Sequence, residues 1–308
     1  MQSVVQYGRC LSRTLVTVIT SELSLPWKNR TGRERSLHLV TAASGYGNHS
    51  HSPAEVLKKW SFGDDACFIA KHKLSDILGV ADGVGGWRSY GVDPSEFSSK
   101  LMQTCERMVN RGHFRPQAPA ELLAASYSEI LENKESLIGS CTACLVSLNQ
   151  EEKTVYTANL GDSGFLIVRN GQVIHRSEEQ QHYFNTPFQL SVAPPTHRGR
   201  VLSDSPEAAQ RTSFGVQIGD IILLGTDGLF DNLSDDMILD QLQDLKGTSM
   251  ECIQQIANSL VKKALQVAFD PECMSPFALS ACEHGIECVG GKPDDITVLL
   301  ARVEEQES

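Results

Sequence analysis

Acidic residues recur at the ends of five apolar runs. Asp64 and Asp65 precede ACFIA (66–70), Asp82 closes ILGVA (77–81), Asp162 follows TVYTA (154–158), Asp227 follows IILL (221–224), and Asp294 and Asp295 open ITVLL (296–300). One aspartate beside a strand is usually a turn or cap residue. Three of these segments also contain glycine, in ADGVGG, LGDSG and GTDGLFDN. The pattern therefore predicts a shared site if the strand ends converge.

Converging carboxylates would need positive charge beside them. Two unit charges ~4 Å apart repel by roughly 4 kcal/mol at an effective dielectric constant near 20. Mg2+ and Mn2+ prefer carboxylate, carbonyl and water ligands, and no His-rich cluster beside the acids points to zinc. Asp82 could bridge two such ions while the carbonyl of Gly83 supplies another ligand. Two metals ~3.5–4 Å apart can generate a bound hydroxide and stabilise in-line displacement at phosphorus.

Three cysteine patterns offer competing interpretations: Cys105 and Arg111 as C-x5-R, Cys141 and Cys144 as C-x-x-C, and Cys282, His284 and Cys288 as zinc ligands. The first lacks the glycines of a phosphate cradle and falls in a helical pattern. The second alternates like a buried strand, and the third has no fourth ligand nearby. Nine cysteines without framework spacing indicate reduced thiols in an intracellular compartment. We expect none of the three patterns to be catalytic.

The elements that must position the acids are strands interspersed with helices. Further strand-like runs are TACLVSL (142–148) and GFLIV (164–168), and Asn170-Gly171 predicts a two-residue hairpin after the latter. Helices are expected from Asp93 to near Gly112 and over 119–133, 234–245 and 249–267. Residues 176–218 are rich in Pro, Gln and polar groups, which indicates long loops. The pattern predicts an α+β fold, with sheets packed together and helices outside.

Charge divides the chain into a leader and a domain. Residues 1–40 carry six basic and two acidic residues, a net +4, within an overall charge of −11. This Arg- and Ser-containing start is typical of a mitochondrial transit peptide, and a disordered tail is the alternative. We expect a leader at 1–40, a linker within 41–60, and a single catalytic domain at 41–308. The acidic balance argues against nucleic-acid binding, and no apolar run reaches the roughly 18 residues of a membrane span.

Five segments, in order, resemble the metal-dependent type 2C protein phosphatase family: GDDACF, ADGVGGW, ANLGDSG, TDGLFDN and PDDITV. Each is weak alone, but their order and spacing over about 62–303 are specific. The wording RSEEQQHYFNTPFQLS and GGKPDDITV is similar to the mitochondrial branch of this family. The resemblance implies two packed antiparallel β-sheets flanked by helices in four layers (α-β-β-α). It also implies hydrolysis of phosphoserine and phosphothreonine in phosphoprotein substrates. From the leader we expect the protein to act in the mitochondrial matrix, and we expect it to be a monomer.

The resemblance also implies a role for each acid. Two Mn2+ or Mg2+ ions would be held by Asp82, Gly83, Asp227 and Asp294, with Asp64 and Asp65 holding metal-bound waters and Asp162, together with Asp227, binding a weaker third ion. Catalysis is assigned to Asp65, Asp82 and Asp227, which would position the metal-bound water that attacks phosphorus without a phosphoenzyme intermediate.

The chain departs from the family pattern at four positions: Val84 stands where many members have a His, Trp60 where an Arg contacts phosphate, Gly164 in place of the Arg of G-D-S-R, and Asp295 in place of an Asn. Lys58, Lys59 and Arg88 are the candidates to replace the missing arginine. The departures leave open a catalytically weak phosphoprotein-binding module. An aspartyl-phosphate hydrolase is a third class, but it would need a D-x-D motif, whereas Asp227 and Asp231 lie four residues apart.

Overall fold

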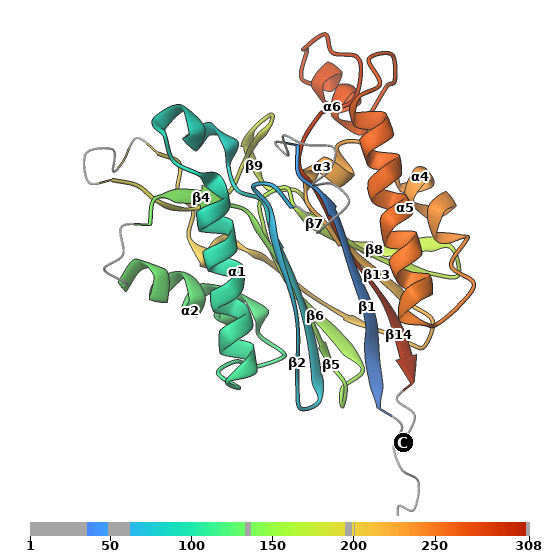
Figure 1. The fold of residues 1–308 in the computed structure, drawn as a ribbon. Coiled ribbons are helices and arrows are strands. Elements are labelled where there is room, and N and C mark those ends of the chain that lie inside the picture. The colour runs from blue at the N-terminus through green and yellow to red at the C-terminus, as the bar shows by residue number, and fades with distance from the viewer. Residues whose placement is uncertain (1–35, 49–61, 133–136, 195–198, 200, 306–308) are drawn as a thin grey trace, which may run out of the picture. The chain divides into compact units, whose positions relative to one another are not determined.

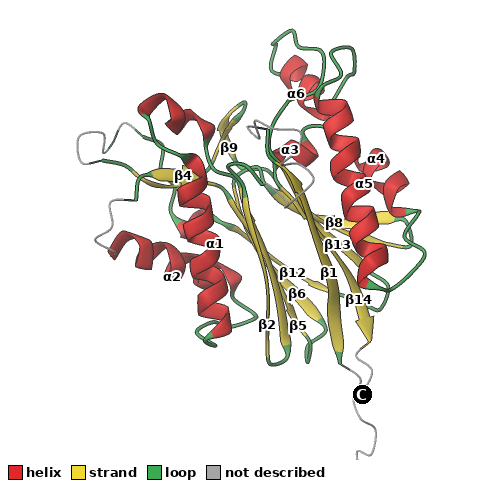
Figure 2. Cartoon of the chain, viewed as in Figure 1, coloured by secondary structure: helices red, strands yellow, loops and turns green. Residues whose placement is uncertain are grey.

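The computed structural model describes residues 36–48, 62–132, 137–194, 199 and 201–305. These residues belong to one compact unit, Arg35–Ser308. Figures 1 and 2 show two β-sheets lying against each other, with helices on their outer sides. Within the described residues, no helix is both long enough and apolar enough to cross a membrane.

Each of the two large sheets is antiparallel and has five strands. The first runs in the order β1 (Leu37–Tyr46), β14 (Ile296–Glu305), β13 (Ile221–Gly225), β7 (Gly164–Arg169), β8 (Gln172–Arg176). The second runs in the order β12 (Gln210–Gly215), β6 (Thr154–Leu160), β5 (Ala143–Asn149), β3 (Ser75–Ala81), β2 (Ala66–His72). Leu78 and Val146 of the second sheet share one buried cluster with Phe165 and Leu299 of the first. The sheets are therefore packed face to face.

Helices cover the outer face of each sheet. The second sheet is covered by α1 (Pro94–Asn110) and α2 (Pro119–Glu132), and the first by α5 (Met250–Ala268) with α4 (Asp235–Leu242) beside it. Helix α1 begins as expected, since the Asp93 side chain accepts a hydrogen bond from the Ser95 N–H and Pro94 takes the first helical position. The four-layer α-β-β-α fold is confirmed.

The predicted strands and helices form close to their expected bounds. The Asn170-Gly171 hairpin is also confirmed, because both residues have positive φ, 52° and 75°, and β7 pairs with β8 in antiparallel fashion. Two short helices were not expected, namely α3 (Asp227–Phe230) and α6 (Pro276–Glu283). They are only four and eight residues long, too short for a clear helical period.

Two loop expectations are wrong. The linker expected within 41–60 is strand up to Tyr46, because β1 pairs with β14 over its whole length, from Leu37 opposite Glu305 to Tyr46 opposite Ile296. The expected boundary at residue 40 falls inside this strand. Residues 176–218 contain β9 (Gln181–Tyr183), β10 (Thr186–Pro187), β11 (Leu190–Val192), the 3-10 helix η3 (Pro206–Ala208) and β12. β12 is an edge strand whose side chains alternate between intermediate and exposed, so its polar composition concealed it.

Candidate metal centre

Three of the predicted acids meet where the two sheets lie together. Asp82 follows β3, Asp162 follows β6, and Asp227 follows β13 and opens α3. A carboxylate oxygen from each lies within 4.8 Å of the other two. Among the described residues, no other group of three His, Cys, Asp or Glu side chains converges in this way. The three acids line a cavity of about 270 Å3 that also contains Asp64 and Asp294.

The glycine after Asp82 is required by close packing of the backbone. A Cβ atom on Gly83 would lie 2.5 Å from the carbonyl oxygen of Asp64 and 2.7 Å from that of Pro94. The Gly83 N–H donates to the same Asp64 carbonyl at 3.2 Å. This contact brings the ADGVGG and GDDACF segments together, and the ADGVGG backbone lines the cavity. Gly83 therefore lies at the cavity, where a ligand can approach its carbonyl closely.

Asp64 and Asp65 have different partners. Asp65 is buried, and its Oδ2 accepts a hydrogen bond from Thr226 Oγ1 at 2.7 Å. Asp64 forms an ion pair with Arg88, and both residues line the cavity. Arg88 is thus the one candidate for the missing arginine that lies among the described residues. Lys58, Lys59 and Trp60 lie outside them.

Asp294 and Asp295 also differ although they are adjacent. Asp295 accepts hydrogen bonds from two backbone N–H groups, from Asn48 at 2.5 Å and from Asp64 at 2.6 Å. Its Asp side chain fits this role better than the Asn of the family pattern, because both of its oxygens act as acceptors. Asp294 accepts from the Asp295 N–H through Oδ1, and its Oδ2 lies 3.5 Å from Lys292 Nζ. Both residues line the cavity, but only Asp294 has a carboxylate oxygen, Oδ2, that accepts from no backbone N–H and can face a cation.

Burial and mutual repulsion raise the pKa values of the acids in the cluster. Burial raises the pKa of Asp82 well above its ordinary value, and Asp227 and Asp65 raise it further. The pKa values of Asp65 and Asp162 are raised for the same two reasons. Burial together with Asp227 also raises the pKa of Asp294 to about 7. A divalent cation would oppose all of these shifts, because it favours the charged carboxylates.

Unpartnered oxygens show that the residues present fit a cation. Asp65 Oδ1 and Asp162 Oδ1 are buried and have no hydrogen-bond partner. An unpaired buried carboxylate oxygen is costly, whereas a hard cation or its waters would satisfy it. The described residues that line the cavity include six aspartates and no histidine. This donor set suits Mg2+ or Mn2+ better than zinc.

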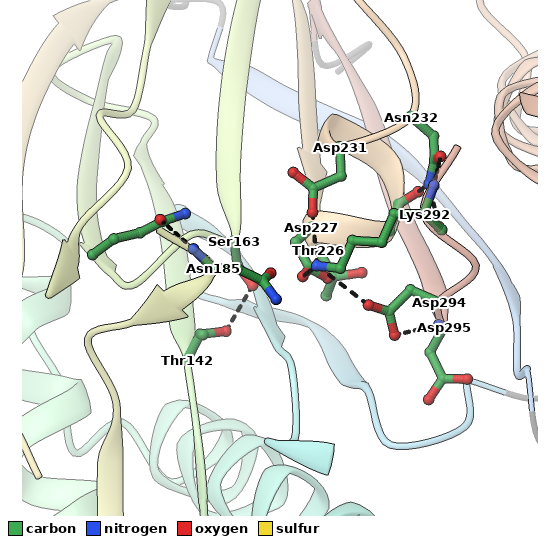
Figure 3. Close-up of polar contacts among 12 residues, drawn as sticks. Thr142, Ser163, Asn185, Thr226, Asp227, Asp231, Asn232, Lys292, Asp294 and Asp295 are labelled. Atoms are coloured by element: carbon green, nitrogen blue, oxygen red, sulfur yellow. Dashed lines mark hydrogen bonds and ion pairs between the residues drawn. The ribbon is translucent and has the colours of Figure 1, made fainter. Parts of the chain in front are cut away.

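Lys292 is the residue of the site that the sequence reasoning missed. Figure 3 shows its side chain reaching between Asp227, Asp231 and Asp294. Its Nζ forms ion pairs with Asp227 and, at 2.7 Å, with Asp231. Burial raises the pKa of Asp231 to about 7 even though Lys292 lowers it. The available signal was the lysine of GGKPDD, a basic residue two positions before an acidic pair.

The structure shows the surroundings of two residues that depart from the family pattern, Val84 and Gly164. Val84 lines the cavity and carries no group that transfers a proton. Gly164 leaves no room for a longer side chain, because a Cβ there would collide with Ser177 Oγ, which accepts from the Phe165 N–H at 3.0 Å.

The cysteines of two of the three patterns lie in the buried core. Cys105, Cys141 and Cys144 are fully buried, and burial raises the pKa of the Cys105 thiol to about 12. Cys282 lies with its Sγ 3.6 Å from the carbonyl oxygen of Cys288. Among the described residues, the converging group of possible metal ligands contains only aspartates, so Cys282, His284 and Cys288 do not form such a group.

Comparisons with known proteins agree with this geometry. The family model described as stage II sporulation protein E (SpoIIE) matches residues 77–304. A Homo sapiens protein named "Protein phosphatase PTC7 homolog" is 55% identical over 306 residues, covering 99% of each chain. The X-ray structure of the photosystem II phosphatase PBCP is 26% identical, with a TM-score of 0.72, and covers 87% of this chain and 99% of that one.

A more distant structure shares the fold. The catalytic domain of the serine/threonine protein phosphatase PstP in complex with two manganese ions has a TM-score of 0.50 at 18% identity, covering 88% of this chain and 99% of that one. The family model spans most of the chain, and the human relative spans nearly all of it. The chain belongs to the metal-dependent type 2C protein phosphatase family (PPM/PP2C), and it is a protein serine/threonine phosphatase.

Proposed function

We propose that this phosphatase works with two Mn2+ or Mg2+ ions in the acidic cavity and acts on mitochondrial phosphoproteins. The observation that carries the proposal is the convergence of Asp82, Asp162 and Asp227 from three different strands, within 4.8 Å. The two manganese ions of the structurally similar PstP domain support the count of two. Bound there, the ions would supply a water of lowered pKa as nucleophile and would neutralise charge on the phosphoryl group.

The chain's own residues would divide the work as follows. Asp82, Asp227, Asp294 and the Gly83 carbonyl would hold the ions. Asp64 and Asp65 line or border the same cavity and would orient the coordinated waters. Thr226 fixes one oxygen of Asp65, which leaves the unpartnered Oδ1 to accept from a water. The buried oxygens of Asp65 and Asp162 that lack a hydrogen-bond partner would thus be satisfied once the ions and their waters are bound.

Arg88 is the residue that would bind the substrate phosphate. Its guanidinium forms an ion pair with Asp64 at the cavity, and its side chain is 42% exposed. A guanidinium presents a fixed fork of donors that matches two phosphate oxygens. Residues 58–60, where the family pattern and the two lysines would place this function, lie outside the described residues.

The first experiment is hydrolysis of a phosphothreonine peptide by the full chain, with Mn2+ and then with a chelator. Asp82→Asn is compared with Asp240→Asn, a matched change at an exposed aspartate of α4. We expect turnover that requires the metal and Asp82 and is unaffected by Asp240→Asn. Full activity of Asp82→Asn, or activity that survives complete metal removal, would overturn the binuclear mechanism.

A phosphoprotein-binding module with little turnover is the second candidate function. It is favoured by Val84, which lines the cavity without offering an acid to the leaving group. Under saturating Mn2+, such a module would retain phosphoproteins without releasing phosphate. Measured turnover of the phosphothreonine peptide decides between the two.

The location and assembly of the protein are also proposals. The basic, hydroxyl-rich segment 1–40 supports import into the mitochondrial matrix. A fusion of residues 1–40 to a reporter should enter mitochondria, and a reporter that stays in the cytosol would contradict import. The chain is proposed to be a monomer, and its mass in solution by light scattering tests this.

A further inference from the structure

Lys292 is held inside the acidic cluster by its backbone as well as by its charge. Its N–H donates to Asn232 Oδ1 at 2.9 Å, and its carbonyl accepts from Asn232 Nδ2 at 2.9 Å. Asn232 is itself fully buried, and it also donates to the carbonyl of Gly228 in the helix that begins with Asp227. This two-way amide pair fixes the lysine relative to α3. The position of the lysine is therefore built into the fold.

The side chain of Lys292 is enclosed along its length. Only 16% of it is exposed, and its ammonium lies 5.3 Å from the ring centroid of Phe277. The ammonium donates to Asp227 Oδ2 and to Asp231 Oδ2, and Asp294 Oδ2 lies 3.5 Å away. A cation enclosed by three carboxylates and an aromatic face is desolvated and stably charged. Carboxylates surround this ammonium as they would surround a bound metal ion, but here the positive charge belongs to a side chain of the protein.

We propose that the Lys292 ammonium is a permanent internal cation that takes the place of a third metal ion between Asp227 and Asp231, so that the centre binds two divalent ions. This inference rests on the proposed binuclear function. It replaces the expectation that Asp162 and Asp227 hold a weaker third ion. Asp227 then has two partners: its Oδ2 accepts from the lysine, and it also converges with Asp82 and Asp162.

Charge explains why the lysine and a third ion exclude each other. Asp231 is 2.7 Å from the ammonium, and Asp227 is in direct contact with it. A divalent ion that used the same two carboxylates would lie within a few ångströms of the ammonium, in a site with little water to screen the repulsion. Removal of the lysine charge would leave Asp231, and the Oδ2 atom of Asp227, without their cation and able to bind an ion. The proposal therefore predicts that neutral substitutions at Lys292 increase the number of metals bound.

The test is a count of Mn2+ ions bound per full chain at saturating Mn2+, by equilibrium dialysis with metal analysis. We expect two ions in the wild-type protein, two in Lys292→Arg and three in Lys292→Met. Lys292→Gln has an uncharged side chain that can still form hydrogen bonds, so it provides the same test if Lys292→Met does not fold. Addition of Asp231→Asn to Lys292→Met should return the count to two, since Asp231 is proposed to hold the additional ion.

Arg88→Met is the matched control, because it removes a positive charge from the same cavity at a residue that contacts Asp64 instead. It should leave the count at two. Three ions in both the wild type and Lys292→Met would overturn the proposal, since the lysine would then move aside. Two ions in both would overturn it as well. No bound Mn2+ in the wild type would instead overturn the binuclear centre, so the two failures are distinguishable.

Discussion

The backbone N–H of Asp64 donates a hydrogen bond at 2.6 Å to the carboxylate of Asp295, 231 residues later in the chain. The other oxygen of Asp295 accepts from the Asn48 N–H at 2.5 Å. Asp295 thus joins the first and last acidic segments of the family pattern. It positions the start of β2 against the start of β14. Asp64, expected to hold a metal-bound water, and Asp294, expected to bind a metal, lie just before these two strands.

Asp295→Asn should therefore destabilise the fold. An amide has one acceptor oxygen, so one backbone N–H would lose its partner, at a cost of about 1–3 kcal/mol of unfolding free energy. The measurement is urea unfolding of the full chain with saturating Mn2+, which offsets changes in repulsion within the cluster. Asp240→Asn, at an exposed aspartate of α4 away from the cluster, is the control and should change the unfolding free energy less than Asp295→Asn. Equal stability of Asp295→Asn and the wild type would contradict the structural role.

Asp82→Asn should change stability in opposite directions with and without metal. Burial and neighbouring carboxylates raise the pKa of Asp82, so removal of its charge should stabilise the metal-free protein by about 1 kcal/mol. With Mn2+ at about 100 times its dissociation constant, the wild type gains roughly 2.7 kcal/mol through binding, and the variant loses most of this gain. Asp82→Asn should therefore be less stable than the wild type with Mn2+ and more stable than the wild type with chelator. The same rank order in both conditions would exclude Asp82 as a principal ligand.

Mn2+ affinity should increase with pH up to about 7. The pKa values of Asp231 and Asp294 are raised to about 7, so the folded, metal-free protein keeps protons that the unfolded chain releases near pH 4. Metal-free stability consequently falls as pH rises through this window. Mn2+ held by Asp294 displaces the proton of that carboxyl, so its stabilisation should grow over the same window and level off above about pH 7–8. Titrations of Mn2+ at several pH values check this, and a flat profile from pH 5 to 7 would contradict it.

Cys105→Ala should retain phosphatase activity. The thiol is fully buried in α1, and burial raises its pKa to about 12, so it is neutral and inaccessible. We expect kcat within about twofold of the wild type, and an unfolding free energy lower by about 1–2 kcal/mol because the substitution leaves a small cavity. Activity of the full chain after treatment with a thiol-alkylating reagent is a parallel check. Loss of activity in a folded Cys105→Ala protein would revive the cysteine mechanism.

Arg88→Ala should weaken substrate binding. If its guanidinium binds the phosphate, its loss should raise KM about tenfold, and Arg88→Lys should recover only part of the affinity, because a lysine lacks the two-pronged donor geometry. The inhibition constant of inorganic phosphate should rise by the same factor. Mn2+ affinity, measured on the same variants, should change little. A normal phosphate inhibition constant in Arg88→Ala would assign phosphate binding elsewhere.

Much of the fold follows from local features of the sequence. Apolar runs such as ILGVA, the Asn170-Gly171 turn and the Asp93-Pro94 start of α1 each determine an element through bonds made within a few residues. The acids at the strand ends were recognisable for the same reason, since each is defined by its own strand. By itself, the sequence therefore determined most of the central strands, the longer helices and the identity of the acidic cluster.

Tertiary structure decided the features that depend on distant partners. β1 is a strand because β14 pairs with it, about 260 positions later in the chain. Asp294 and Asp295 are neighbours, yet one joins the acidic cluster and the other accepts from the Asn48 and Asp64 backbone. The ammonium of Lys292 reaches Asp227 and Asp231 because Asn232 fixes its backbone beside α3. Pairing, side-chain direction and enclosure are properties of surfaces brought together by packing, and no local pattern of residue types records them.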